Sequence, residues 1–139
     1  MSPFDGGKPV LIIDGSRFDD YDGFAREFSA LLDDWTWNKN LDAFNDILWG
    51  GFGTPEDGFV LRWLHSGRSR EALGWAETIK YLEHILARCH PTNREHCRAE
   101  IEAARRQEGQ TLFDRVVEII QSHAVGGGGS ENGIELELT

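Results

Sequence analysis

The chain has 139 residues, of which 40% are hydrophobic, and it includes 8 Phe and 5 Trp. This is enough apolar side chain for one core, so we expect a single domain over residues 1–139. The formal net charge of −10 disfavours nucleic acid as a direct partner, because phosphate would be repelled, and it favours a basic partner. The acidity is concentrated, since residues 1–60 carry a net charge of −8 and residues 61–139 only −2.

The sequence contains no apolar run of the roughly 18 to 20 residues that a membrane span requires. Residues 1–8 do not have the pattern of an export leader. We therefore expect a soluble, cytoplasmic protein without a membrane partner. In that compartment Cys89 and Cys97 are expected to be reduced thiols, and a disulfide between them is the alternative.

The first half of the chain alternates strand and helix patterns. The continuous apolar run at Pro9–Ile13 predicts a buried strand, and apolar residues at helical spacing over 21–32 predict a covering helix. A second helix is predicted from Asn40 to Trp49. The apolar stretch Phe59–Leu64 then predicts a second strand.

The second half is mostly helical. Apolar spacing predicts helices over 75–89 and 111–124, and residues 92–95 have the form of a capping box for a further helix to about Gln107. That helix has a thin apolar face, so it should be largely exposed. Residues 126–130 read as a flexible Gly-rich loop, and the alternation over 134–138 predicts a last strand with one wet face.

Strands alternating with helices imply right-handed crossovers. The expected fold class is α/β, with a three-stranded parallel sheet packed with helices and an extra helical section at about 72–110.

Two acids on the second helix are the first candidate functional residues. Asp42 and Asp46 are four residues apart, so both carboxylates lie on one face, where like charges cost a few tenths of a kcal/mol. Asn40 is a plausible cap, and a helix N-terminus favours nearby acids. Either the helix simply begins with solvated acids, or the carboxylates form a surface for a cationic partner.

Aromatic residues precede this helix in a polar segment. Trp35 and Trp37 are two residues apart, and each could be either buried in the core or exposed. Exposed aromatics beside paired carboxylates would imitate a polyanion with stacked bases, which a base-stacking, cationic site could accept.

Other chemistry finds little support. Cys89, His90, His96 and Cys97, with His84 upstream, could surround a zinc ion, but their spacing favours a helix-turn-helix with free thiols. The sequence has no nucleophile-elbow, phosphate-loop or zinc-protease motif. We therefore expect a protein that is not an enzyme and has neither cofactor nor metal.

The segment Asn40–Asp46, with sequence Asn-Leu-Asp-Ala-Phe-Asn-Asp, resembles the characteristic helix of the barstar family of ribonuclease inhibitors. Phe59–Trp63 is similar to that family's second strand, and Gly133–Leu138 to its short final strand. The resemblance implies a barstar-like fold in which the helix occupies a ribonuclease active site without being cleaved. Residues 72–110 form a longer helical section than the smallest members have.

The family's functional residues transfer only in part. Its two helix aspartates correspond to Asp42 and Asp46, whereas Asn45 stands where the best-known members have an aromatic. Their paired tyrosines correspond to Thr36 and Trp37. The residues expected to contact the partner are Trp35, Thr36, Trp37, Asn38, Asn40, Asp42, Asn45, Asp46, Trp49 and Glu118, the last as the nearest match to a glutamate of the final helix.

Our leading hypothesis is a stoichiometric inhibitor or immunity protein for a basic ribonuclease or nuclease toxin, monomeric when free. The alternative is an intracellular adaptor that uses the barstar-like fold to bind a partner that is not a nuclease.

Overall fold

The computed structural model describes residues 4–5, 8–32, 35–49, 54–55, 58–124 and 133–139. Its strands form one sheet in the order β1-β2-β3-β4. β2 (Lys8–Asp14), β3 (Phe59–Leu64) and β4 (Ile134–Leu138) are parallel, and the short β1 (Phe4–Asp5) pairs antiparallel with β2. The predicted three-stranded parallel sheet is confirmed, with β1 as an addition. The predicted loop at 126–130 lies outside the described residues.

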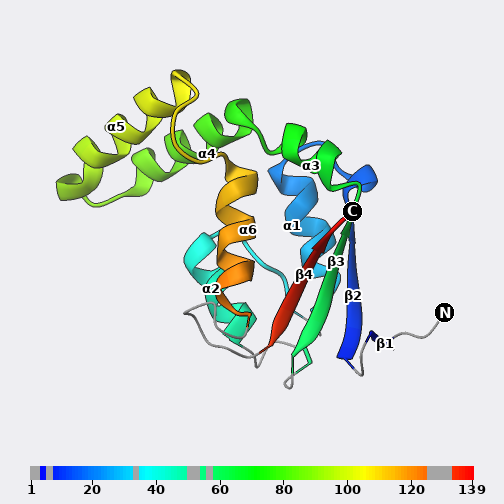
Figure 1. Ribbon diagram of the computed structural model, residues 1–139. Helices are drawn as coiled ribbons and strands as arrows, with labels where there is room; N and C mark the ends of the chain where they lie inside the picture. The colour runs from blue at the N-terminus through cyan, green and yellow to red at the C-terminus, as the bar shows by residue number, and fades with distance from the viewer. Residues whose placement is uncertain (1–3, 6–7, 33–34, 50–53, 56–57, 125–132) are drawn as a thin grey trace.

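The helices lie on one side of the sheet and beyond it. They are α1 (Tyr21–Ser29), α2 (Leu41–Trp49), α3 (Ser66–Ala72), α4 (Trp75–Arg88), α5 (Arg94–Arg105) and α6 (Leu112–Ser122), with short 3₁₀ turns η1 (Gly15–Arg17) and η2 (Pro91–Asn93). Figure 1 shows α1, α2 and α6 gathered beside the sheet, whereas α4 and α5 project away from it as an arm, residues 75–105. Among the described helices none is long and apolar enough to cross a membrane.

The face of the sheet toward the helices is apolar. Ile13 lies beside Trp63 across β2 and β3, and Phe59 lies beside Ile134 across β3 and β4. All four side chains are buried. The helices add Phe24, Phe28, Phe44, Leu48, Phe113, Val116 and Ile120 to the same cluster. Since burying one such side chain contributes about 1.5–3 kcal/mol, this cluster holds the helices on the sheet.

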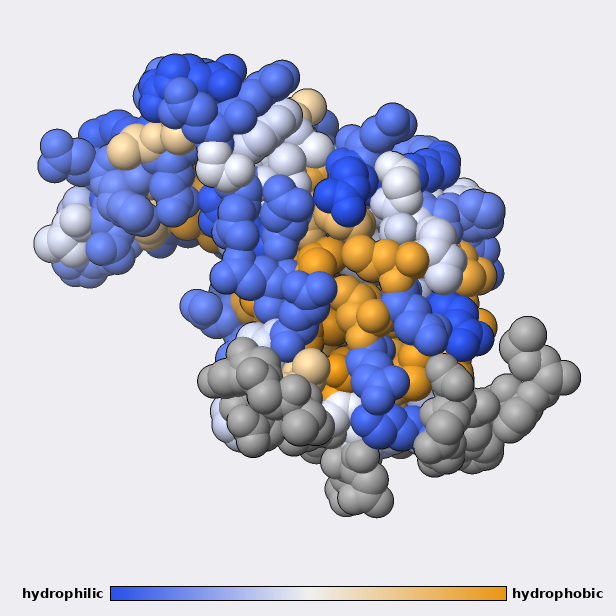
Figure 2. Space-filling model, viewed as in Figure 1, coloured by the Kyte–Doolittle hydropathy of each residue, from blue (hydrophilic) through white to orange (hydrophobic). Residues whose placement is uncertain are grey.

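The last strand has the predicted alternation. Leu136 packs toward the core, whereas Glu135 is exposed and Glu137 accepts a 2.8 Å hydrogen bond from Nε of Arg62. Leu138, at the end of the strand, stays 38% exposed. Figure 2 shows hydrophobic surface along this strand, beside the hydrophilic face of α6.

Helix α3 was not predicted, because its sequence has no apolar stripe. Contacts with other elements hold it instead. Nη1 of Arg68 donates to the carbonyls of Gly15 at 2.7 Å and Phe18 at 2.6 Å. Nε1 of the buried Trp63 donates to Oγ of Ser69 at 2.9 Å. α3 is therefore tied to both the 3₁₀ turn η1 and the central strand.

The N-terminus of α6 is where the arm joins the rest of the fold. The backbone N–H of Leu112 donates to Oγ1 of Thr78 on α4 at 2.7 Å, and that of Phe113 donates to the Leu73 carbonyl at 3.1 Å. Thr111 and Asp114 form a reciprocal capping box. The N–H groups that a helix start leaves unpaired are thus satisfied partly by the arm.

The capping box predicted at residues 92–95 is wrong. Thr92 lies inside η2, where its hydroxyl lies 2.8 Å from Nδ1 of His90, so it is not available to cap α5. Asn93 holds the cap position without a side-chain hydrogen bond. The predicted thin apolar face of α5 is confirmed, and it packs as a small separate cluster in which Leu82, Ile101 and Ala104 are buried.

The close packing at Gly15 generates a stability prediction. A Cβ at this position would lie 2.3 Å from Oγ of Ser69 and 2.6 Å from the His65 carbonyl, so Gly15→Ala should destabilise the fold by about 3 kcal/mol. A Cβ at Gly67 in α3 meets nothing within 4 Å, so Gly67→Ala should stabilise it by roughly 0.5 kcal/mol. Urea denaturation of both variants measures this, and equal midpoints would contradict the packing described.

Candidate functional site

The segment before α2 is anchored by the ring of Trp37. This ring is 3% exposed and meets Tyr21 edge-on at 5.6 Å and Phe24 at 5.8 Å. Its Nε1 donates to the Asn40 carbonyl at 2.7 Å, and its backbone N–H donates to Oγ of Ser29 at 2.9 Å. The Trp37 ring is therefore buried in the core and not exposed for the predicted contact with a partner.

Residues 39 and 40 fix where α2 begins. Oδ1 of Asn40 accepts the backbone N–H of Ala43 at 2.9 Å, so Asn40 is the helix cap that the sequence predicted. Lys39 has a φ of 73°, and its carbonyl accepts the Tyr21 hydroxyl at 2.7 Å. Nζ of Lys39 lies 2.5 Å from Oδ1 of Asp22 on α1. Both sides of the turn are thus held to α1.

One face of α2 carries charge outward. The helix buries Phe44, Ile47 and Leu48, and its opposite face presents the acidic stripe, which we define as Asp42, Asp46 and Trp49. The Trp49 side chain is 59% exposed. Within the described part of the chain, neither carboxylate has an ion pair or a hydrogen bond. Asp42 lies in the first turn, where the helix dipole favours an acid.

The side-chain oxygen of Asn45 faces α6, and the residue is half-buried. Its Oδ1 lies 2.7 Å from Nε2 of His123, which is completely buried at the end of α6. The His123 ring in turn meets the Trp49 ring edge-on at 6.1 Å. Asn45 was predicted to contact a partner. The contact links α2 to the end of α6, and the partner contact of Asn45 stays a prediction.

The remaining predicted residues are on the surface. Trp35 is 52% exposed, and Thr36 and Asn38 are exposed in the same segment ahead of α2. Glu118 is exposed on α6, where its carboxylate accepts a hydrogen bond from Gln110. No contact among the described residues joins Glu118 to the acidic stripe, so its partner contact stays a prediction.

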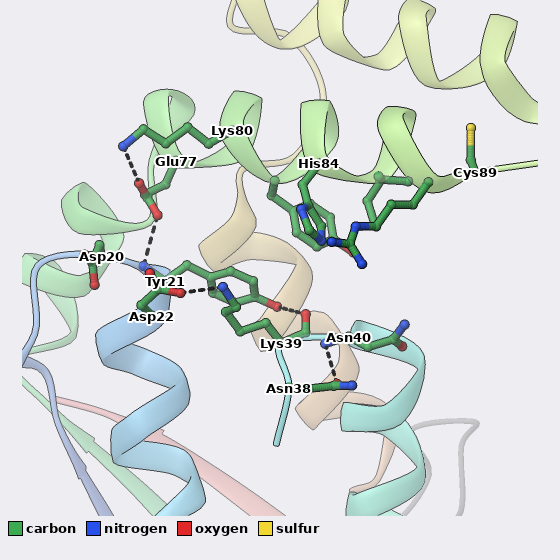
Figure 3. A pocket seen from close by; sticks show the side chains of 13 residues that line it. Asp20, Tyr21, Asp22, Asn38, Lys39, Asn40, Glu77, Lys80, His84 and Cys89 are labelled. Atoms are coloured by element: carbon green, nitrogen blue, oxygen red, sulfur yellow. Dashed lines mark hydrogen bonds and ion pairs between the residues drawn. The ribbon is translucent and has the colours of Figure 1, made fainter. Parts of the chain in front are cut away.

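A cleft of about 580 Å³ lies beside this segment and was not predicted. It is bounded by the start of α1, residues 38–40 and the underside of α4 (Figure 3). Tyr21 and Tyr81, whose rings meet edge-on at 5.7 Å, form its aromatic wall. His84 and Arg88 line it from α4, and their spacing of four residues was the signal in the sequence that both would lie on one helix face.

Ion pairs neutralise one end of the cleft. Nζ of Lys80 lies 3.3 Å from Glu77, whose other carboxylate oxygen accepts the Tyr21 backbone N–H at 3.0 Å. The hydrogen bond and charge of Lys39 lower the pKa of Asp22. Lys39, Lys80 and the two carboxylates are therefore already partnered within the chain.

The cysteines and histidines around the end of α4 lie mostly at the surface. Cys89 and Cys97 are free thiols, the first half-buried and the second buried. No group of three or more His, Cys, Asp or Glu side chains that could hold a metal ion occurs in the described ranges.

A comparison with protein families gives one match. The model of a family described as Barstar (barnase inhibitor) matches residues 8–102, which is more than half of the chain. The matched span includes the acidic stripe and α4, and it ends before α6 and β4. No curated protein and no solved structure matches the chain.

The aromatic wall of the cleft generates a pH prediction. Tyr21 and Tyr81 are the two tyrosines of the chain, and burial raises the pKa of each above its ordinary value of 10.0. The folded state therefore favours the protonated phenols, so stability present below pH 10 should be lost as the pH rises further. Tyrosinate absorbance should appear only together with the loss of tertiary structure, followed by near-ultraviolet circular dichroism. A separate tyrosinate signal from the folded protein would contradict this.

Proposed function

Because the chain belongs to the Barstar (barnase inhibitor) family, we propose that it binds a basic ribonuclease or nuclease toxin and occludes its active site. The observation that carries this proposal is the acidic stripe, in which Asp42 and Asp46 are exposed and have no partner among the described residues. Two aligned carboxylates that no described residue neutralises are suited to cationic groups of another molecule.

Occlusion would combine charge with shape. A ribonuclease site holds phosphates on cationic side chains and stacks bases on aromatic ones. The stripe offers carboxylates in place of phosphates and the half-exposed ring of Trp49 in place of a base. These groups are amino-acid side chains and contain no phosphodiester bond that a ribonuclease could cleave. The partner would therefore bind them without turnover. The chain would act as a stoichiometric inhibitor and not as an enzyme.

Trp49 takes over a role for which Asn45 is unsuited. Asn45 has no aromatic ring, and its side-chain oxygen lies 2.7 Å from Nε2 of His123. Trp49 lies one turn further along the same helix, and its ring packs edge-on against that same histidine. The aromatic contact is thus displaced by one helical turn, which would change which nuclease is recognised.

Long-range charge should accelerate the encounter. The chain carries a net charge of −10, and most of it belongs to residues 1–60, which include the stripe. A negative field centred on the binding surface steers a cationic partner and raises its association rate. The association rate with a basic nuclease should therefore fall as salt is added.

The test is inhibition of RNA cleavage by purified barnase and by other basic ribonucleases, with the chain titrated to equal concentration. Inhibition complete at one equivalent supports the proposal. If no nuclease is inhibited while the chain captures a protein that is not a nuclease, the adaptor function replaces it.

Charge removal on the stripe should weaken the inhibited complex. Asp46→Ala and Asp42→Ala should each cost at least about 2 kcal/mol of binding, or roughly thirtyfold in the inhibition constant. Glu71→Ala, which removes an exposed acid from α3, is the matched control and should change the constant less than about twofold. Equal effects from all three variants would show that net charge, and not the stripe, matters.

A further inference from the structure

We propose that the cleft under α4 binds a carboxylate side chain of the protein partner, with Arg88 as its cationic end and His84 as a further hydrogen-bond donor. This inference rests on the proposed function and deepens it, because it adds a second contact of opposite charge to the one made by the acidic stripe. The partner would then present a cationic surface to α2 and an acidic side chain to the arm.

The basic side chains that line the cleft divide into those with and those without a partner among the described residues. Lys39 is paired with Asp22, and Lys80 with Glu77. Arg88 has no ion pair or hydrogen bond through its side chain within the described ranges, and neither has His84. A guanidinium that lines a concave site without an internal carboxylate is a ready partner for an external one.

The other groups in reach are hydrogen-bond donors. Oδ1 of Asn38 accepts the Asn40 backbone N–H at 3.3 Å, and Oδ1 of Asn40 accepts that of Ala43 at 2.9 Å. The oxygens of both amides are thus used within the chain, which leaves their NH₂ groups to donate outward. Figure 3 shows His84 extending from α4 toward the segment that carries Asn40. Guanidinium, imidazole and amide donors together suit an oxyanion.

The charge of the cleft allows an anion to approach, although the chain as a whole is strongly acidic. Its acidic lining residues are Asp20, Asp22 and Glu77, and they are balanced by Lys39, Lys80 and Arg88. Asp20 is also engaged, because its Oδ1 caps α1 by accepting the Gly23 N–H at 2.8 Å. Each of the three carboxylates therefore has a partner within the chain. The end of the cleft at Arg88 is the part that can bind an external anion.

The occupant belongs to the protein partner because the cleft adjoins the proposed binding surface. Asn38 and Asn40 line the cleft and also stand in the segment that leads into the acidic stripe. Burial is the main cause that raises the pKa of Tyr81 in the cleft wall, and the negative charge of Asp42 raises it further. A partner seated on the stripe would meet the cleft at its edge, and alternating charges would fix its register.

The test uses a capped Gly-Glu-Glu-Gly peptide as the probe, with the matched Gly-Gln-Gln-Gly peptide as its neutral control. Side-chain NMR resonances of His84 and Arg88 in the full chain report binding. We expect saturable shifts with the glutamate peptide and at least about tenfold weaker binding of the glutamine peptide. Absence of a saturable shift would overturn the proposal, as would inorganic phosphate binding equally tightly at the same ionic strength.

Matched variants locate the site. Arg88→Gln should weaken binding of the glutamate peptide by about tenfold. Arg26→Gln changes an exposed arginine of α1 that does not line the cleft, so it should leave binding unchanged. Because Arg88 is exposed and makes no internal hydrogen bond through its side chain among the described residues, its loss should not impair folding. An equal response of both variants would place the peptide elsewhere.

Inhibition of a ribonuclease separates the two proposals. Arg88→Glu should raise the inhibition constant by about tenfold, and Arg26→Glu should not. If wild-type inhibition is intact and Arg88→Glu has no effect, the cleft proposal fails and the proposed function stands. If no ribonuclease is inhibited although the peptide binds at Arg88, the proposed function fails and the cleft remains an anion site without its nuclease.

Discussion

The burial of the Trp37 ring is the constraint from which the candidate surface follows. Its indole N–H donates to the Asn40 carbonyl, and this same carbonyl accepts the N–H of Phe44 in the first turn of α2. One buried ring therefore determines where the helix starts. Because α2 must bury Phe44 against the same aromatic cluster, the rotation of the helix is fixed too, and Asp42 and Asp46 have to face outward.

The arm is coupled to this surface through the start of α6. The N–H of Leu112 needs an acceptor, and Thr78 of α4 supplies it from a buried position. Breaking this contact would leave a buried donor without a partner, which costs about 1–3 kcal/mol. The hydrogen bond from the Leu112 N–H to Thr78 therefore fixes α4 against the start of α6. This position keeps the underside of α4 opposite Tyr21, where it forms the second wall of the cleft.

The sequence predicts those parts of this arrangement that follow from local pattern. The strands at Lys8–Asp14 and Phe59–Leu64 contain the apolar runs that predicted them, and α4 has clear apolar periodicity. Asn40 caps α2 as its residue type suggests. Local pattern could not predict α3, because this helix is polar. It is held in place by hydrogen bonds from Arg68 to carbonyls that are far away in the sequence.

The choice between two tryptophans was equally beyond local pattern. Trp35 and Trp37 are two residues apart in a polar segment, and only the position of the aromatic cluster decides that the second is buried. The role of Asn45 depends on His123, which lies 78 residues away. The cleft likewise needs α1 and α4 to be brought together before its lining exists, so no single stretch of sequence contains it.

The division of charge on the surface explains how an acidic chain can be selective as well as attractive. Uniform negative charge would favour any basic protein, because long-range attraction does not depend on the arrangement of the partner's groups. Arg88, which has no ion pair among the described residues, would change this, since a partner with cationic groups on both sides would meet repulsion at the arm. Discrimination of this kind needs an unfavourable contact with wrong partners as well as a favourable one with the right partner. On the proposed function, the arm would supply the unfavourable contact and α2 the favourable one, so specificity would depend on α6 holding the two at a fixed separation.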